Sequence, residues 1–340
     1  MPGANPKVGT AAPMPGIFEA LPGIETPVGS ISGGLAQMWE GTASEGKPSP
    51  ANENAKAIQV NFVLLLGFRT DAADAVRQFE TAVKFSRRHP SRVVVLCPIP
   101  DEAGATEMLA KVYGECSVGK TKDDMRCCEF VMLSYPRSAR PHLENQVSIC
   151  LSTDLPLYFW AHGFVDAAKL ADYSYLMTTA KRIIIDSATA PPGIAGYPWP
   201  HPENVRDLAY ARLLPVRQSI GQFLSRYPAH TLSEGLASIT LSHGEGVAAE
   251  ARVLLGWVRD RMAECGAKGE AAAVEESTAI PTEGFELVFA YSDKKSFRWT
   301  ADVAAAHATF DADFGNGRTS MQVSAAFLTP ETALSEAMFF

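Results

Sequence analysis

Runs of apolar residues separated by amphipathic segments organise the first half of the chain. Residues 58–66 and 93–97 are near-continuous apolar runs, the pattern of strands covered on both faces. Between them, apolar positions predict a helix that begins at Thr70 or Asp71 and ends near Arg88, where basic residues complement the helix dipole. A strand, a helix and a second strand in this order predict an α/β sheet.

The same alternation continues as far as residue 189. Strands are predicted at 126–133, 157–160 and 183–185, with helices at 142–151 and 167–179. Residues 105–113 have an apolar spacing that suits either a helix or a strand, and both remain open. Polar residues follow the last two strands, at the strand ends where functional groups of α/β sheets collect. The pattern therefore predicts a Rossmann-like mixed sheet.

The C-terminal part has a different pattern. A loop or linker at 190–202 precedes a long helix at 205–226, bent at Pro215, then a strand at 237–242 and a helix at 247–262. Residues 266–284 predict a mobile connection. Strand-like segments follow at 285–291, 297–302, 308–313 and 319–327, with Asn316-Gly317 as a hairpin signal. This part is expected to end in an antiparallel β meander.

These patterns predict three parts within the α/β class. Residues 1–54 form an N-terminal extension with a short helix at 32–40. Residues 55–189 form the Rossmann-like α/β domain. Residues 190–340 form an α+β C-terminal domain that ends in the β tail.

Composition narrows the function classes. The chain has 340 residues and a formal net charge of −8, so it lacks the excess of Lys and Arg that nucleic-acid binding requires. No apolar run approaches the roughly 20 residues that span a bilayer, and the N-terminus does not have the pattern of a secretory leader. Six cysteines without regular spacing fit reduced thiols. We therefore expect a cytoplasmic protein without nucleic-acid or membrane partners.

Gly114–Thr121 matches the phosphate-loop pattern G-x-x-x-x-G-K-[ST]. In such a loop, backbone N–H groups hold the phosphates, a lysine such as Lys120 neutralises them, and a hydroxyl such as that of Thr121 holds Mg²⁺. The motif requires a strand directly before it and a helix directly after it. The last clear strand before it ends near Cys97, and a strand-like segment follows it. P-loop-type nucleotide binding is therefore kept as an alternative function.

The cysteines of the same region do not predict a metal site. Cys116, Cys127, Cys128 and Cys150 lie near His142, but without the C-x₂₋₄-C pairs of structural zinc sites. Adjacent residues of a strand point to opposite faces, so one of Cys127 and Cys128 is expected in the core and the other facing a loop or solvent. No metal or cofactor is predicted, and a redox role for Cys116, Cys127 or Cys128 stays open.

His162 and Asp186 stand at two predicted strand ends. A histidine there could perform acid–base chemistry, although a loop histidine bonded to the backbone explains it as well, and Asp186 suits a cap or turn. The chain has no G-x-S-x-G, and no G-x-G-x-x-G follows the first strand. No catalytic residue is assigned, and a degenerate α/β sugar-phosphate enzyme is a further alternative.

Arginine and aromatic residues near the strand ends point to a protein interface. These residue types anchor protein–protein contacts, while their other interpretation is solvated helix surface. The candidates for a partner interface are Trp160, His162, Asp186, Asp207, Arg212 and Arg217.

A set of sequence blocks between about Ile31 and Met262 resembles the glucose-6-phosphate dehydrogenase assembly proteins, the OpcA family. The blocks are Ser30-Ile-Ser-Gly-Gly-Leu-Ala-Gln-Met-Trp39, Asn61-Phe-Val, His89-Pro-Ser-Arg92, Cys128-Glu-Phe-Val-Met-Leu133, Asp154-Leu-Pro156 with Trp160, Ile185-Asp-Ser187, Asp207-Leu with Arg212-Leu and Arg217, and Leu254-Leu-Gly-Trp257. The family commonly has two tryptophans where Phe159-Trp160 stands, and a tryptophan where Pro215-Val216 stands. The chain therefore resembles a divergent member.

The resemblance implies a protein that is not an enzyme. Members of the family associate with oligomeric glucose-6-phosphate dehydrogenase and promote its assembly or activation, at the entry to the oxidative pentose phosphate pathway. It therefore implies glucose-6-phosphate dehydrogenase as the partner and an allosteric activating role. An activator of this kind must bind the competent state of its partner more tightly than the idle state.

Overall fold

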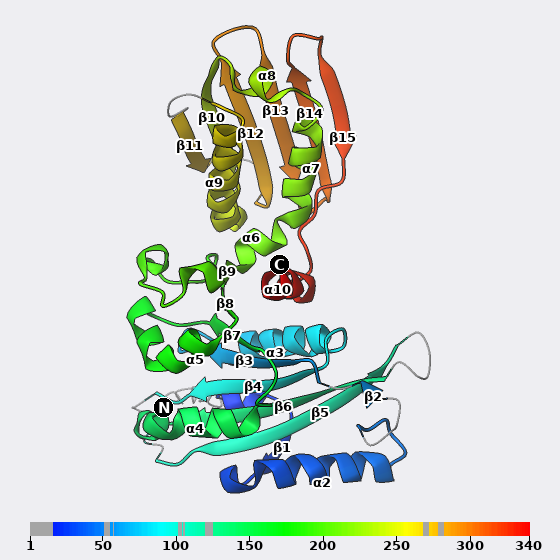
Figure 1. Cartoon of the computed structure of the whole chain (residues 1–340), viewed down its shortest axis with the longest axis vertical. Helices are drawn as coiled ribbons and strands as arrows, with labels where there is room; N and C mark the ends of the chain where they lie inside the picture. Colours follow the sequence, from blue (N-terminus) through cyan, green and yellow to red (C-terminus); the bar gives the residue numbers. More distant parts are fainter. Residues whose placement is uncertain are drawn as a thin grey trace, which may run out of the picture. The chain divides into compact units, whose positions relative to one another are not determined.

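The computed structural model (Figure 1) describes residues 16–50, 55–56, 58–100, 104, 106–119, 125–267, 272–277 and 282–340. It divides into two compact units. The first comprises Met1–Leu157 and Ala161–Val165, and the second comprises Tyr158–Trp160 and Asp166–Phe340. The fold is α/β, with a mixed sheet and a second, separate sheet. Sequence boundaries at 54/55 and 189/190 remain predictions, and each unit is described by itself.

The first unit is built on a mixed sheet with the strand order β1-β5-β6-β4-β3. Strands β3 (Val60–Leu66), β4 (Ser91–Pro98) and β6 (Met125–Tyr135) run parallel, while β5 (Leu109–Val118) and β1 (Ile24–Thr26) are added antiparallel. The short β2 (Ala55–Lys56) pairs parallel with β6. Every residue of β3 is buried, as its continuous apolar run predicts. The prediction of a mixed sheet is confirmed, and the ambiguous segment 105–113 contains the start of a strand.

Helices cover both faces of this sheet. Helix α3 (Ala72–Ser86) is capped by Asp71, whose carboxylate accepts the N–H of Asp74, and Phe79 packs 4.8 Å from the ring of Phe130 on β6. Helix α2 (Ile31–Ser44) runs along β5 and β1 on the other face (Figure 1). The unit also contains α1 (Ile17–Ala20), the 3₁₀ turns Val28–Ser30 and Arg137–Ala139, and α4 (Arg140–Cys150).

Strand β7 (Leu157–His162) is divided between the two units. In the first unit its end lies beside β3, because the N–H of Gly67 donates to the carbonyl of His162 at 2.8 Å. In the second unit its central residues pair parallel with β8 (Arg182–Ile185), and β8 pairs parallel with β9 (Val205–Asp207). The segment between β7 and β8 begins as a 3₁₀ helix (Ala167–Tyr173) and continues as α5 (Ser174–Thr179), so the predicted helix is α-helical only in its second half.

The long helix predicted at 205–226 is wrong. Residues 205–207 are strand β9, and two helices follow, α6 (Leu208–Arg212) and α7 (Leu214–Leu224). Asp207 starts α6 by accepting the N–H of Ala209. Pro215 stands in the first turn of α7, where its missing N–H costs no hydrogen bond. The proline therefore starts a new helix and does not bend a continuous one.

The second sheet has the strand order β11-β10-β12-β13-β14-β15. Its strands are β10 (Leu236–His243), β11 (Ala272–Ser277), β12 (Gly284–Tyr291), β13 (Ser296–Asp302), β14 (His307–Asp313) and β15 (Thr319–Val323). The pairs from β10 through β12 to β15 are antiparallel, while β11 pairs parallel with β10. The predicted meander is confirmed, and Gly317, at φ 95°, follows Asn316 in the turn between β14 and β15.

Helices α7 and α9 (Ala248–Glu264) lie on one face of the second sheet (Figure 1). Between helices and sheet is an aromatic core in which Phe223 of α7 stacks on Phe310 of β14 at 4.3 Å, next to the fully buried Trp299. The unit also contains α8 (Ala229–Ser233), the 3₁₀ turns Ile194–Gly196, Pro202–Asn204 and Glu245–Val247, and a C-terminal helix α10 (Pro330–Phe339), which packs on α6. Among the described residues, no helix has the length and apolar character needed to cross a membrane.

Candidate functional site

Two of the predicted interface residues, Arg212 and Asp186, form an ion pair in the second unit, and a third, Asp207, lies close to Asp186. Arg212 ends α6 and donates to Asp186, which follows β8, and to Glu250 in the first turn of α9. We call Asp186, Asp207, Arg212 and Glu250 the Arg212 cluster. Burial alone would lower the pKa of Arg212, but the two carboxylates raise it, so the side chain stays charged. The cluster ties a strand end and two helices together by partly buried ion pairs.

Asp207 completes the Arg212 cluster from the end of β9. One carboxylate oxygen accepts two backbone N–H groups, from Ala209 at 2.9 Å and from Ser187 at 3.0 Å. Burial raises the pKa of Asp207, the N–H donors offset part of the rise, and the negative charge of Asp186 adds to it. Asp207 thus caps α6 and holds the turn after β8.

Glu250 is the member of the Arg212 cluster that sequence reasoning missed. It lies in a helix that the sequence predicted, but nothing in the local pattern indicates that its side chain points inward. Its second carboxylate oxygen, Oε2, is buried without a hydrogen-bond partner. A buried carboxylate of this kind depends on its single strong partner, Arg212.

Arg217 lies one helix further along and supports an exposed tyrosine. Its guanidinium stacks 3.6 Å from the ring centre of Tyr210 and donates to the carbonyl of Tyr210 at 3.3 Å. Arg217 is 8% exposed, whereas Tyr210 is 42% exposed. Burial lowers the pKa of Arg217, while Tyr210 and Glu336 of α10 counteract this effect. Of this pair, only Tyr210 presents a large surface to solvent.

His162 and Trp160 are buried and do not reach the surface as anchors. His162 ends β7 in the first unit, and its Nε2 lies 2.6 Å from the carboxylate of Asp74 in the first turn of α3. Burial alone would raise the pKa of Asp74, but hydrogen bonds from His162 and Gln78 lower it. Sequence reasoning missed Asp74, which is 88 residues from its partner. The two strand-end residues His162 and Asp186 therefore have different hydrogen-bond partners.

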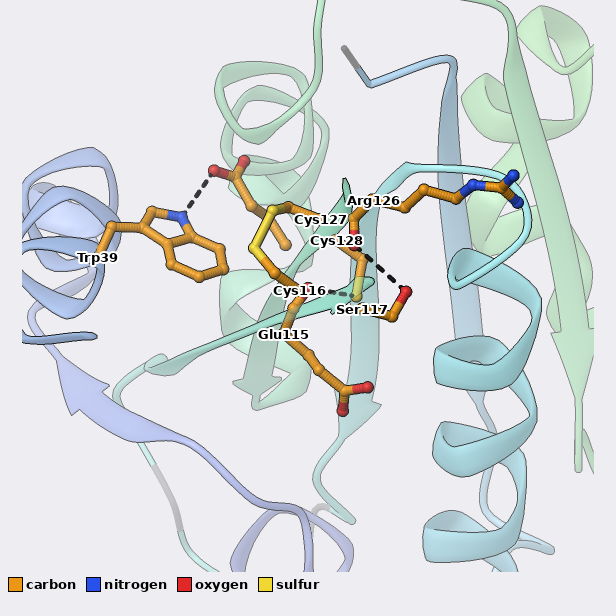
Figure 2. Close-up of a disulfide and its surroundings, with 8 residues drawn as sticks. Trp39, Glu115, Cys116, Ser117, Arg126, Cys127 and Cys128 are labelled. Carbon is orange, nitrogen blue, oxygen red and sulfur yellow. Dashed lines mark hydrogen bonds between the residues drawn. A yellow bond between two sulfur atoms is a disulfide. The ribbon is translucent and has the colours of Figure 1, made fainter. Parts of the chain in front are cut away.

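Cys116 and Cys127 form a disulfide across β5 and β6 (Figure 2). The expectation of reduced thiols is therefore wrong for these two residues, because the β5–β6 register places them directly opposite each other. The expectation that Cys127 or Cys128 faces loop or solvent is also wrong, because both are buried. Cys128 points to the other face, where its thiol donates to the carbonyl of Glu115 at 3.4 Å. Burial raises the pKa of Cys128 to about 12.

The phosphate-loop match lies in strand structure as far as it is described. Gly114–Val118 belong to β5, where their backbone pairs with β6, and the chain is again a strand from Met125. Lys120 and Thr121 lie outside the described residues. A phosphate loop would lead from a strand into a helix, with its N–H groups free to bind. Across the described parts of the chain, no group of three or more His, Cys, Asp and Glu side chains is arranged to hold a metal ion.

The fold and the site define an α/β protein whose polar strand-end residues have partners inside their own unit, with an exposed tyrosine on the short helix α6 of the second unit. Residues 82–196 match the family model of the glucose-6-phosphate dehydrogenase assembly proteins (OpcA), described as the glucose-6-phosphate dehydrogenase subunit N-terminal domain. The resemblance to the OpcA family is thereby confirmed at modest identity.

Two curated relatives support the same family, and both are named OxPP cycle protein OpcA. The protein of Synechocystis sp. (strain ATCC 27184 / PCC 6803 / Kazusa) is 23% identical over 185 residues, which are 51% of this chain and 37% of the relative. The protein of Nostoc punctiforme (strain ATCC 29133 / PCC 73102) is 21% identical over 194 residues, 53% of this chain and 40% of the relative. The match thus spans less than half the length of either relative.

Proposed function

We propose that this chain is a non-catalytic factor that binds oligomeric glucose-6-phosphate dehydrogenase and promotes its assembly or allosteric activation, in support of the oxidative pentose phosphate pathway. The observation that carries the proposal is the match of residues 82–196 to a domain described as part of a glucose-6-phosphate dehydrogenase subunit. The names of both relatives refer to the oxidative pentose phosphate cycle. A cytoplasmic location is part of the proposal.

The pairing of the polar candidates supports a role without catalysis. A general acid or base must exchange a proton with a substrate that it contacts. His162 is buried against Asp74, and Asp186 is held by Arg212. Both side chains are therefore engaged inside the protein, where they stabilise the ends of β7 and β8.

Because most of the candidate side chains are engaged inside the protein, we infer that they support an interface and do not contact the partner themselves. Tyr210 is not one of the six candidates, but it is exposed and rests on the guanidinium of the candidate Arg217. Tyrosine and arginine are both enriched among the residues that dominate binding energy. In this proposal Tyr210 contacts the dehydrogenase, while Arg217 and the Arg212 cluster hold α6 in position. Trp160 and His162 shape the strand end from inside.

Activation follows from differential binding. A partner that binds the competent oligomer more tightly shifts the enzyme toward that state by the ratio of the two affinities, and equal affinity shifts nothing. Couplings of this kind are typically about 1–3 kcal/mol, or about 5- to 150-fold. By reciprocity, substrate that favours the competent oligomer would tighten the binding of this chain by the same factor.

The test is a dehydrogenase assay with and without this protein. Initial rates are measured over a range of glucose 6-phosphate concentrations, under reducing and oxidising conditions, and light scattering after size exclusion reports the mass of the mixture. We expect a joint peak and a change in KM, kcat or oligomer mass. An unrelated acidic protein at equal concentration is the control. Separate elution with superimposable rate curves under both conditions would refute the proposal.

A further inference from the structure

We propose that the Cys116–Cys127 disulfide is a site of reversible thiol–disulfide exchange, and that its reduction loosens helix α2 from the β5–β6 hairpin. The two cysteines are 11 residues apart in sequence and directly opposed in the hairpin, with their Cα atoms 4.0 Å apart. Cys127 is buried, whereas Cys116 is partly exposed and lies two residues before the exposed Val118 at the end of β5. Cys116 is thus the more exposed of the two residues, and we take its sulfur as the one that a reductant attacks.

The disulfide lies on the face of the hairpin that α2 covers. Side chains of a strand alternate between faces, so Gly114 and Cys116 share one face of β5, and their partners Glu129 and Cys127 share the same face of β6. A Cβ on Gly114 would meet the ring of Trp39 at 2.5 Å, so α2 approaches the hairpin closely at that point. On this face of the hairpin, the Cys116–Cys127 pair is therefore the next residue pair after Gly114 and Glu129, which contact Trp39.

A hydrogen bond fastens α2 beside the bridge. The indole N–H of Trp39 donates to Glu129 at 3.0 Å (Figure 2), and Arg92 of β4 holds the other oxygen of Glu129 at 2.7 Å. The position of α2 on the hairpin therefore depends on the position of Glu129, which follows Cys127 by two residues. The disulfide fixes the two strands to each other at this place, where the paired part of the hairpin ends.

The exchange balances with a dithiol as the reductant. A thiolate of the dithiol attacks Sγ of Cys116, the S–S bond breaks, and Cys127 leaves as a thiolate that takes up a proton. The second thiol of the reductant then displaces Cys116, which also becomes a thiol. The reductant ends as a disulfide, and two electrons have passed to the protein. Cys128 takes no part, because its thiol points to the opposite face and donates to the carbonyl of Glu115.

Reduction removes the covalent tie between β5 and β6 and leaves backbone pairing to hold the end of the hairpin. Strand ends that lack other constraints lose their backbone pairing more often than the centre of a sheet does. A helix that packs on such strand ends then loses its contacts as well. Helix α2 has one buried residue, Ile31, so its own packing contributes little to holding it. The oxidised protein is therefore expected to hold α2 more firmly than the reduced protein.

Differential alkylation followed by peptide mass mapping tests the exchange itself. The full chain is air-oxidised, then equilibrated with dithiothreitol at increasing ratios of its reduced to its oxidised form. We expect Cys116 and Cys127 to resist alkylation at first and to become modified together as the ratio rises. Free alkylation of both residues in the air-oxidised protein would overturn the proposal, as would a bridge that resists reduction in the folded chain.

Hydrogen exchange tests the effect on α2 in the same samples. Reduction should speed amide exchange in residues 31–44 and 109–118 by about tenfold, while residues 284–313 of the second sheet stay unchanged as an internal reference. Equal exchange of residues 31–44 in the two redox states would refute the control of α2. Faster exchange in both regions would mean general unfolding and would refute it too.

Two serine variants provide matched controls. Cys116→Ser should show the fast exchange of the reduced protein without any reductant, and it should no longer respond to dithiothreitol. Cys128→Ser changes the neighbouring cysteine on the other face and should keep the full redox response. If Cys116→Ser fails to fold, Cys127→Ser replaces it, with residues 284–313 again as the folding reference. A response that survives in either bridge variant, or is lost in Cys128→Ser, would contradict the assignment.

Discussion

The carboxylate of Asp207 accepts two backbone N–H groups through one oxygen, an arrangement that an amide oxygen can reproduce. We therefore expect Asp207→Asn to keep the cap of α6 and to remove a buried charge next to Asp186. Its stability at pH 7 should equal or exceed that of the wild type. Asp207→Ala loses both acceptor contacts and should cost about 1–2 kcal/mol. Urea unfolding of the three proteins measures the difference.

The effect of pH on the stability difference between the wild type and Asp207→Asn has a defined sign. Because the pKa of Asp207 is raised in the folded protein, its protonated form contributes stability that is fully present below the unfolded pKa of about 4 and is lost as pH rises through the folded pKa. The advantage of Asp207→Asn over the wild type should therefore grow across that window. An advantage that shrinks as pH rises would contradict the cause assigned to the shift.

Asp74 contributes to stability with the opposite dependence on pH. Its pKa is lowered in the folded protein, so its ionised form contributes stability that is present above the unfolded value of about 4 and is lost as pH falls through the folded pKa. Asp74→Asn should unfold more easily than the wild type at pH 7, and the gap should close below about pH 4. Asp260→Asn, on a carboxylate side chain that is 61% exposed, is the control and should give no such gap.

Helix α2 sits on β5 at a position where only a glycine fits. A Cβ on Gly114 would lie 2.4 Å from the end of Met38 and 2.5 Å from the ring of Trp39, whose indole is held by Glu129. Gly114→Ala should therefore cost about 1–3 kcal/mol, because the helix must shift. Gly41→Ala, in the exposed part of the same helix where a Cβ meets nothing within 4 Å, should instead stabilise by about 0.5–1 kcal/mol. Thermal unfolding of both variants checks the signs.

Elements with a near-continuous apolar run could be predicted from the sequence, whereas a segment whose apolar spacing suits two periods stayed undecided. The continuous runs of β3 and β4 identified these strands directly. Strand β5 stayed ambiguous because the apolar spacing of residues 105–113 suits either a helix or a strand. The structure shows in addition that Lys111 of this strand is buried. The structure accommodates it by hydrogen bonding its ammonium group to the carbonyl of Phe18 at 2.9 Å, in helix α1. The local sequence pattern around Lys111 cannot reveal this hydrogen-bond partner, which is 93 residues away.

The candidate site shows the same limit. Asp186 could be selected from the sequence because it follows a predicted strand, Arg212 because arginine is a residue type that anchors interfaces, and Asp207 because it belongs to a block that resembles the family. Glu250 and Asp74 could not, because each is defined by a partner on another element. The disulfide was hidden for a related reason. With β5 undecided, the register that places Cys116 opposite Cys127 could not be derived.

At the scale of the whole molecule, the Arg212 cluster links segments of the second unit that are far apart in sequence. Removing Arg212 alone leaves the carboxylates of Asp186 and Glu250 unpaired, and Arg212→Met should cost about 3–5 kcal/mol. Adding Asp186→Asn and Glu250→Gln should restore most of that loss, since no buried charge then remains unpaired. Arg259→Met, at a surface pair, should change stability by less than about 0.5 kcal/mol. Urea midpoints compare the four proteins.

The family match and the proposed contact residue lie in different parts of the chain. Residues 82–196 draw on both units, whereas Tyr210 and Arg217 lie beyond the match. The match therefore supports the class of partner but not the position of the contact. Two exposed aromatic residues allow the position to be tested, because Tyr210 is 42% exposed in the second unit and Phe68 is 41% exposed in the first.

Tyr210 and Phe68 are almost equally exposed, so replacing each with alanine shows which of the two surfaces contributes to binding glucose-6-phosphate dehydrogenase. Tyr210 rests on the buried Arg217 at 3.6 Å and is held in place before binding, so Tyr210→Ala should weaken association by about tenfold or more while changing the unfolding midpoint little. Phe68→Ala should leave association unchanged. Titration calorimetry of each variant with the dehydrogenase gives the affinities. A loss confined to Phe68→Ala would move the contact to the first unit, and wild-type affinity in both variants would remove Tyr210 from the interface.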